Sequence, residues 1–202
     1  MKQFRPLSGR PLISWSYDML SSAGCSPIVV VVPDDSFDIA RSTLGEGVVL
    51  ASGGATRRDS IRNGLMLIET QQVVVHDAAR PFATVEMVAG VLERLTNFDG
   101  AICAMPVTET LKRAVGDIVV DTVDRAQLHR AQTPQAFRTK LLKHAHQVAL
   151  EEDFHPTDDA QLIERCGGRI GLVQGSASNM KITYSEDFEL AEAIARTTGQ
   201  DA

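Results

Sequence analysis

Short runs of β-branched apolar residues alternate with segments of helical spacing along most of this chain. Apolar runs of this kind are typical of strands in a parallel sheet, because helices cover both faces of such a sheet. The alternation therefore predicts an α/β fold, namely a Rossmann-like, mostly parallel sheet with helices on both faces. The 202 residues suit one domain of this kind, which we expect to occupy residues 1–202.

The spacing of apolar residues also predicts the individual elements. We expect strands at residues 28–32, 48–50, 73–75, 101–105 and 169–174. We expect helices at residues 11–23, 37–44, 85–95, 141–148 and 160–166, another after Gly54, and a last one from Ser185.

The pattern changes between residues 107 and 135. Residues 118–123 follow the turn-forming pair Gly116-Asp117, which predicts an exposed β-hairpin arm inserted at about 107–135. A two-stranded arm cannot bury both of its faces alone, so we expect it to pack on another subunit and make a homodimer. The alternative for Lys112 and Arg125 is a solvated strand edge, where positive charge discourages wrong pairing.

The overall charge limits the possible partners. Lys and Arg number 20 against 26 Asp and Glu, a net charge of −6, so we expect no nucleic acid partner, and a phosphate ligand must meet a local basic site. Cys25, Cys103 and Cys166 are too far apart for a zinc or disulfide pattern. No apolar run is long enough to span a membrane and no signal peptide is evident, so we expect a cytoplasmic protein without a membrane partner.

Ligands of an open parallel sheet bind beyond the carboxyl ends of its strands, and two loops there carry candidate groups. Residues 53–60 join a strand to a helix, and the pair Gly53-Gly54 lets backbone N–H groups approach a ligand; a plain turn with a capping serine explains the segment equally well. His76, Asp77 and Arg80 follow the next strand. Their alternatives are a core histidine and a loop ion pair.

Two later segments carry further charged groups. Asp158 and Asp159 suit either a metal ion or the N-terminus of a helix, and helix capping is favoured. Lys181 lies after the last strand, where it suits a phosphate clamp, although loop lysines are usually only solvated.

Taken in order, these segments resemble one known family. The shared motifs are Lys2-Gln3-Phe4, Leu7-Ser8-Gly9-Arg10-Pro11-Leu12, Gly53-Gly54 with Arg57 and Ser60, His76-Asp77-Ala78-Ala79-Arg80-Pro81, Thr110-Leu111-Lys112, Thr122-Val123-Asp124-Arg125, Gln132-Thr133-Pro134-Gln135-Ala136-Phe137, Asp158-Asp159-Ala160, and Asn179 with Lys181 and Thr183. Over essentially its whole length the chain resembles the 2-C-methyl-D-erythritol 4-phosphate cytidylyltransferases of the non-mevalonate isoprenoid pathway.

The resemblance implies a reaction between CTP and methylerythritol 4-phosphate, with Mg²⁺ or another divalent cation and with release of pyrophosphate. The substrate phosphate attacks the α-phosphorus directly, so no protein nucleophile is needed, and the protein must align two anions and neutralise charge. By this resemblance Lys2, Arg125 and Lys181 are catalytic. The resemblance also implies roles in nucleotide and substrate binding for a further set, Gly53, Gly54, Ser60, Asp77, Ala78, Thr110, Thr133 and Arg80.

The metal ligands are not given by the sequence; Asp77 is the candidate, acting beside the CTP phosphates. In the family the arm crosses to a partner subunit, so the resemblance implies a homodimer in which Thr110 and Arg125 serve the neighbouring site.

The chain departs from the family pattern at its start. The family opens with a central strand and a glycine-rich, arginine-containing loop before the position of Lys2, and no counterpart precedes Lys2 here. The strands beside this position are therefore expected to have unpaired edges.

Two rival functions stay open at this point. One is a cytidylyltransferase for another polyol phosphate such as ribitol 5-phosphate, and the other is a catalytically impaired relative that only binds nucleotide.

Overall fold

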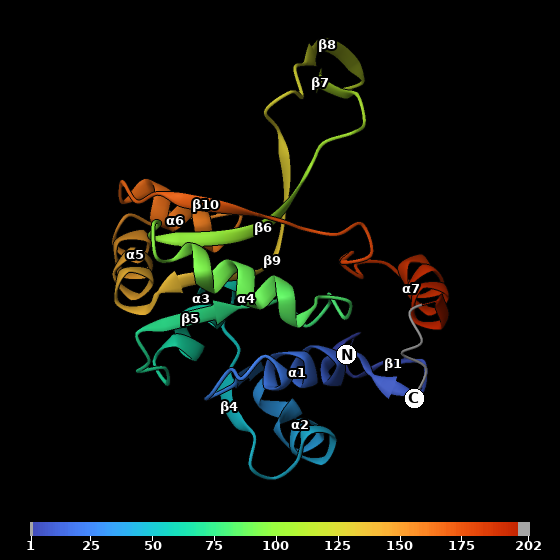
Figure 1. Cartoon of the computed structure of the whole chain (residues 1–202), viewed down its shortest axis with the longest axis vertical. Coiled ribbons are helices and arrows are strands. Elements are labelled where there is room, and N and C mark those ends of the chain that lie inside the picture. Colours follow the sequence, from blue (N-terminus) through green and yellow to red (C-terminus); the bar gives the residue numbers. More distant parts are fainter. Residues whose placement is uncertain (1, 198–202) are drawn as a thin grey trace.

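The computed structural model describes residues 2–197 and contains a mixed α/β fold from which one β-hairpin protrudes (Figure 1). The strands of the main body and arm are β1 (Pro6–Leu7), β2 (Arg10–Pro11), β3 (Val29–Val32), β4 (Val49–Ser52), β5 (Gln72–Val75), β6 (Gly100–Pro106), β7 (Leu111–Val115), β8 (Ile118–Val123), β9 (His129–Arg138) and β10 (Ile170–Gln174). The α-helices are α1 (Leu12–Ser22), α2 (Phe37–Leu44), α3 (Arg57–Leu65), α4 (Val85–Arg94), α5 (Thr139–Glu151), α6 (Asp159–Arg165) and α7 (Glu186–Thr197).

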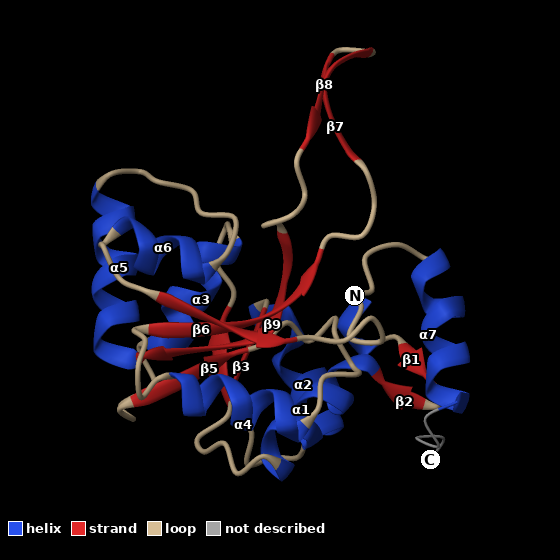
Figure 2. Cartoon of the chain, turned by 45° about the horizontal axis from the view of Figure 1, so that its top comes forward, coloured by secondary structure: helices blue, strands red, loops and turns tan. Residues whose placement is uncertain are grey.

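The largest sheet has four strands in the order β10-β6-β9-β5. β10 is parallel to β6, whereas β9 runs antiparallel to both β6 and β5. Successive side chains of β6 and β9 therefore enter different cores: Ile102 and Phe137 pack with α5 and α6, while Ala101 and Ala136 pack with α4. The predicted fold class, with helices on both faces of the sheet, is confirmed (Figure 2).

β3 and β4 form a separate parallel pair. Within residues 2–197, β3 pairs only with β4, and β5 is the outer strand of the four-stranded sheet. The unpaired edges expected from the family pattern are thus found on β3 and β5. Apolar side chains from α1 and α3 line the space between these two edges.

The antiparallel strand β9 differs from the sequence-based expectation, which assigned residues up to 135 to the arm. From His129 the chain already pairs with β6 in the main sheet, so the paired part of the arm is shorter, β7 and β8 alone. The turn between these two strands contains Gly116 with a φ of 57°, a conformation that glycine adopts without steric cost.

A third core fixes the two ends of the described chain against each other. Leu7 of β1, Trp15 of α1 and Phe188 of α7 are buried together with Phe82 and Ile182. Ile182 is fully buried, and its N–H donates a hydrogen bond of 2.8 Å to the Ala79 carbonyl. This core therefore holds the segment that carries Lys181 against the loop that follows β5.

Candidate active site

Five of the predicted site residues line one cavity of about 650 Å³. These residues come from four segments of the chain, and they are Lys2, Ser60, Asp77, Ala78 and Lys181. Arg57, at the start of α3, lines the same cavity. The structure thus gathers positive groups from the N-terminus, from α3 and from the loop before α7.

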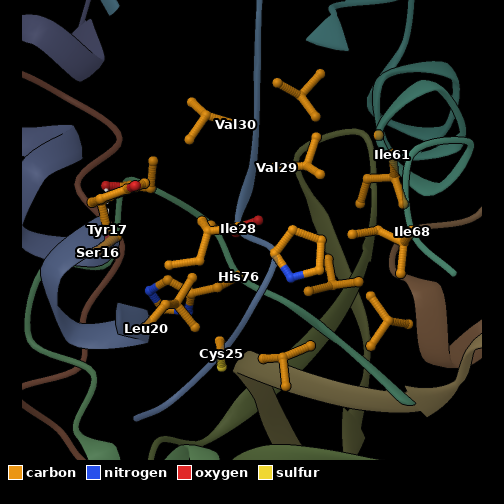
Figure 3. A pocket seen from close by; sticks show the side chains of 18 of the residues that line it. Ser16, Tyr17, Leu20, Cys25, Ile28, Val29, Val30, Ile61, Ile68 and His76 are labelled. Carbon is orange, nitrogen blue, oxygen red and sulfur yellow. Dashed lines mark hydrogen bonds between the residues drawn. The ribbon is translucent and has the colours of Figure 1, made fainter. Parts of the chain in front are cut away.

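The remaining part of the cavity is apolar and lies between β3 and β5. Figure 3 shows Val29 and Ile61 on one side of this part and Tyr17 and Leu20 of α1 on the other, with His76 among them. An apolar wall lowers the local dielectric, which strengthens the interaction of nearby charged groups with each other and with a ligand.

Asp77 is held by contacts on both sides of its carboxylate. Lys181 Nζ lies 2.8 Å from Asp77 Oδ2, and Arg57 Nη2 lies 3.6 Å from Asp77 Oδ1. Burial alone would raise the pKa of this carboxyl group, but the hydrogen bond and charge of Lys181, together with Arg57 and Arg80, lower the pKa below its usual value. Asp77 is therefore a carboxylate at neutral pH.

A chain of hydrogen bonds through Thr133 and His76 fixes the backbone at Asp77. The Asp77 N–H donates to Thr133 Oγ1 over 3.0 Å, and Thr133 Oγ1 lies 3.0 Å from His76 Nδ1. His76 Nε2 lies 3.1 Å from the Arg80 carbonyl, which can only accept. Nε2 is therefore the protonated nitrogen, and Thr133 donates to Nδ1. Burial lowers the pKa of His76 to about 4, so this ring is neutral at pH 7.

Arg80 does not form the loop ion pair that we considered. Its N–H donates to the Asp77 carbonyl over 2.9 Å, while Nη1 donates to the Asn179 carbonyl over 2.8 Å and Nη2 to the Ala131 carbonyl over 3.5 Å. Burial lowers the pKa of Arg80 against the opposing charge of Asp77. Its guanidinium thus ties β9 and the segment before Lys181 to the Asp77 loop.

The glycine loop lies at the N-terminus of α3. A Cβ at Gly54 would come within 2.4 Å of the Asp59 Cβ, so this position requires glycine. The Gly54 N–H donates to Ser60 Oγ over 3.0 Å, and Ser60 Oγ in turn donates to the Thr56 carbonyl. Thr56 caps the helix by accepting from the Asp59 N–H. Gly53 is tied to β3 by a bond from its N–H to the Val32 carbonyl.

Lys2 is bonded to the segment that carries Lys181. Lys2 Nζ donates a hydrogen bond of 2.7 Å to the carbonyl of Ile182, the residue after Lys181. One short segment therefore carries Lys181 and accepts a hydrogen bond from Lys2, and both lysines line the cavity.

Thr110 and Arg125 are not brought to this cavity within one chain. Both are exposed and lie at the base of the arm, where Arg125 donates to the Thr108 carbonyl. Thr133 is buried beneath Asp77, with its hydroxyl engaged as described above. Thr133 therefore fixes the Asp77 backbone and the His76 ring.

The acidic pair before α6 divides into two roles. Asp158 caps the helix by accepting from the Gln161 N–H over 3.0 Å, as the favoured interpretation expected. Asp159 is buried, forms an ion pair with Arg57 and lies within hydrogen-bond distance of His146 Nε2. The sequence did not predict this group, because no spacing in the chain connects residues 57, 146 and 159.

In residues 2–197 no three His, Cys, Asp or Glu side chains gather as a metal site.

No helix in the part of the chain that the structure describes is both long and apolar enough to cross a membrane.

Comparison with known proteins places the chain in one family. The model of the family described as "IspD: 2-C-methyl-D-erythritol 4-phosphate cytidylyltransferase" matches residues 1–197. The 2-C-methyl-D-erythritol 4-phosphate cytidylyltransferase of Bacillus velezensis is 39% identical, over 96% of this chain and 88% of that protein. The enzyme of the same name from Aquifex aeolicus is also 39% identical, over 96% and 89%.

Solved structures agree with the sequence comparison. The crystal structure of 2-C-methyl-D-erythritol 4-phosphate cytidylyltransferase from Thermus thermophilus matches with a TM-score of 0.87 at 36% identity, over 96% of this chain and 94% of that chain. Together with the family model that matches residues 1–197, this similarity shows that the chain belongs to the 2-C-methyl-D-erythritol 4-phosphate cytidylyltransferase family.

Proposed function

We propose that this chain transfers a cytidylyl group from CTP to 2-C-methyl-D-erythritol 4-phosphate. A phosphate oxygen of the polyol substrate forms a bond to the α-phosphorus, the bond from this phosphorus to the bridging oxygen breaks, and pyrophosphate leaves. The observation that carries the proposal is that Lys2, Asp77 and Lys181 line one cavity in a chain of this family. Two polyanions repel each other, and a cavity lined by cations offsets this repulsion.

The nucleotide is proposed to bind between the glycine loop and Asp77. Gly53, Gly54 and Ser60 offer backbone groups and a hydroxyl to the cytosine ring, and Asp77 and Ala78 lie on the ribose and phosphate side. The Gly54 N–H donates a hydrogen bond to Ser60 Oγ. Binding of cytosine at these groups requires that this bond be exchanged for bonds to the base.

Lys2 and Lys181 are proposed to contact the reacting phosphates. Lys2 stabilises the charge that builds on the α-phosphate, and Lys181 holds the phosphate of the polyol in line for attack. The Lys2 ammonium is held by the Ile182 carbonyl and the Lys181 ammonium by the Asp77 carboxylate, so protein contacts orient both groups before substrate binds. Such preorganisation reduces the cost of orienting the reactants.

A divalent cation, Mg²⁺ in the proposed reaction, fits this site only together with the nucleotide. Asp77 is the one carboxylate among the described residues that line the cavity, and Mg²⁺ commonly binds one or two carboxylates plus substrate phosphates. Asp77 would hold the ion from the protein side. When bound, the ion neutralises triphosphate charge and polarises the α-phosphate.

The arm is proposed to complete the site of a second copy of the chain. Val115, Ile118, Val119 and Val120 are more than half exposed on the hairpin, and a two-stranded ribbon with such a surface requires a partner. Thr110 and Arg125 at its base would then reach the polyol side of the partner's cavity. A homodimer in the cytoplasm is the expected form of the protein.

The proposed reaction is tested by incubating the purified chain with CTP, Mg²⁺ and 2-C-methyl-D-erythritol 4-phosphate. Release of pyrophosphate and the ³¹P signals of the cytidine diphosphate product are measured, with ribitol 5-phosphate in a parallel reaction. We expect turnover with methylerythritol phosphate and little with ribitol phosphate. Equal turnover of both would overturn the assignment of the polyol, and a lack of both CTP binding and turnover would overturn the activity.

A further inference from the structure

Arg57 lies between two carboxylates of very different exposure. Its Nη1 is 2.7 Å from Asp159 Oδ2, and its Nη2 is 3.6 Å from Asp77 Oδ1. The side chain of Asp159 is 1% exposed, whereas that of Asp77 is 18% exposed and faces the cavity. Arg57 therefore connects the protein core with the wall of the candidate active site.

Asp159 is itself fixed inside the core. His146 Nε2 of α5 lies 3.1 Å from Asp159 Oδ1, and both side chains are only 1% exposed. A buried carboxylate is costly unless charged or hydrogen-bonding groups surround it. Arg57 supplies the charge, so the packing of α5 against α6 determines where the Arg57 guanidinium lies.

We propose that Arg57 and Asp159, supported by His146, are positioning residues for Asp77 and Lys181. This inference rests on the proposed function, in which Lys181 aligns the polyol phosphate. Asp159 holds the Arg57 guanidinium at 2.7 Å, so that Arg57 Nη2 stays 3.6 Å from Asp77 Oδ1. The other carboxylate oxygen, Asp77 Oδ2, holds Lys181 Nζ at 2.8 Å. The series of contacts His146–Asp159–Arg57–Asp77–Lys181, which we call the relay, joins five segments: α5, α6, α3, the loop after β5 and the loop before α7.

The geometry gives the direction of the effect. If the charge of Asp159 is removed, Arg57 loses its nearer partner, and the attraction of Asp77 draws the guanidinium toward the cavity. Arg57 then competes with Lys181 for Asp77, and the Lys181 ammonium is less restrained. The predicted loss concerns the polyol phosphate more than the nucleotide.

The test compares Asp159→Asn with Glu152→Gln. Glu152 is a matched control because its Oε2 also lies 2.7 Å from an arginine nitrogen, Arg165 Nε, in a half-exposed pair away from the cavity. We expect Asp159→Asn to raise the KM for methylerythritol phosphate at least fivefold and to change the KM for CTP less than twofold, with Glu152→Gln unchanged. Equal changes of both KM values would overturn the proposal.

A second comparison starts from Arg57→Gln alone, which keeps Asp159 and so remains available if Asp159→Asn does not fold. An unchanged KM for methylerythritol phosphate in Arg57→Gln would overturn the proposal. Arg57→Gln removes the partly exposed link and leaves Asp159 with His146, and it is expected to raise the same KM. In the double variant, Asp159→Asn should add nothing to Arg57→Gln, because Asp159 acts only through Arg57. Independent, additive losses would mean separate structural roles and would overturn the relay.

A readout that needs no turnover separates this inference from the proposed function. Lys181 is labelled with acetic anhydride, its modification rate is measured by peptide mass spectrometry, and Lys140, an exposed lysine of α5, is the internal standard. We expect Asp159→Asn to raise the relative rate at Lys181 at least twofold. An unchanged rate overturns the relay even in an active enzyme, whereas a raised rate in a chain without activity on CTP leaves the relay standing and overturns only the proposed function.

Discussion

Asp77 takes its side-chain contacts from α3 and from the loop before α7, so its state depends on tertiary structure. Lys181 provides the nearer cation and the largest contribution that lowers the pKa of Asp77, with Arg57 next. Removal of Lys181 would therefore both delete a cation from the cavity and raise the pKa of Asp77. These two consequences act in the same direction, because each weakens the organisation of charge in the cavity.

Replacement of Lys181 by alanine is predicted to lower kcat/KM by about 10- to 150-fold. This range corresponds to the loss of a charge-assisted contact of about 1.5–3 kcal/mol. Steady-state kinetics with CTP and methylerythritol phosphate measure the change, and Lys140→Ala is the matched control on the exposed surface of α5. Wild-type kinetics in the Lys181 variant would place the polyol phosphate elsewhere.

His76 illustrates a buried group whose role is structural. The neutral ring accepts from Thr133 and donates to the Arg80 carbonyl, and protonation of Nδ1 would remove the acceptor that Thr133 needs. The pKa of about 4 in the folded state lies below the usual 6.5. The unfolded chain therefore binds a proton between pH 6.5 and 4 that the folded chain does not, and stability falls as the pH drops through this window.

This difference predicts a pH-dependent stability that His76→Gln lacks. Between pH 7 and 4.5 the wild type should lose between about 2 and 3 kcal/mol more of unfolding free energy than the variant. Urea unfolding at several pH values measures the slopes, so any overall destabilisation of the variant cancels. His144→Gln, a change of an exposed histidine in α5, should keep the wild-type slope. Parallel slopes for the wild type and His76→Gln would show that His76 titrates normally.

At the scale of elements, apolar runs were predicted well from sequence and polar buried segments were not. The runs that form β3 and β5 are β-branched and locate these strands within a residue. β9 contains Gln132, Thr133 and Gln135, all less than 9% exposed, which resemble loop residues in the sequence. They are tolerated in the core because partners distant in sequence satisfy them; Gln132, for example, bonds to the backbone of Ser176 on both its amide atoms.

The hairpin arm gives a prediction at the same scale. Ile118→Asp is expected to convert the proposed dimer to a monomer without lowering the Tm of the chain body, because Ile118 is 71% exposed in the single chain. Analytical ultracentrifugation measures the oligomeric state. Met66→Asp is the matched control, since Met66 follows α3 and is also 71% exposed, and it should keep the dimer. A monomeric wild type, or a dimer that Ile118→Asp does not weaken, contradicts the proposed role of the arm.

For the whole molecule, the sequence motifs named polar residues that share one cavity, but not the buried charged residues behind them. Lys2, Asp77 and Lys181 were identified through the resemblance, and the structure brings all three to one cavity. Arg57, His146 and Asp159 lie in three helices, and their contacts depend on how α5 and α6 pack against the start of α3. Amphipathic spacing predicts that such helices exist, but it does not specify which charged residues meet between them.

Thr110 and Arg125 lie outside the cavity of their own chain, so the site of the whole molecule is proposed to need two chains. This arrangement predicts that Lys181→Ala and Arg125→Ala, each impaired as a homodimer, restore activity when mixed after subunit exchange. A mixed dimer contains one site with an intact Lys181 and an intact Arg125 from the partner, and one site that lacks both. Random exchange makes half of the dimers mixed, so activity should reach about a quarter of the wild-type value. If each arm served its own chain, no mixed site would be intact and mixing would restore nothing.

Mixing Lys181→Ala with Asp77→Asn is the control, because both changes lie in one cavity. In that mixed dimer every site receives an unaltered arm, but each cavity carries one of the two changes. This mixture should therefore restore no activity.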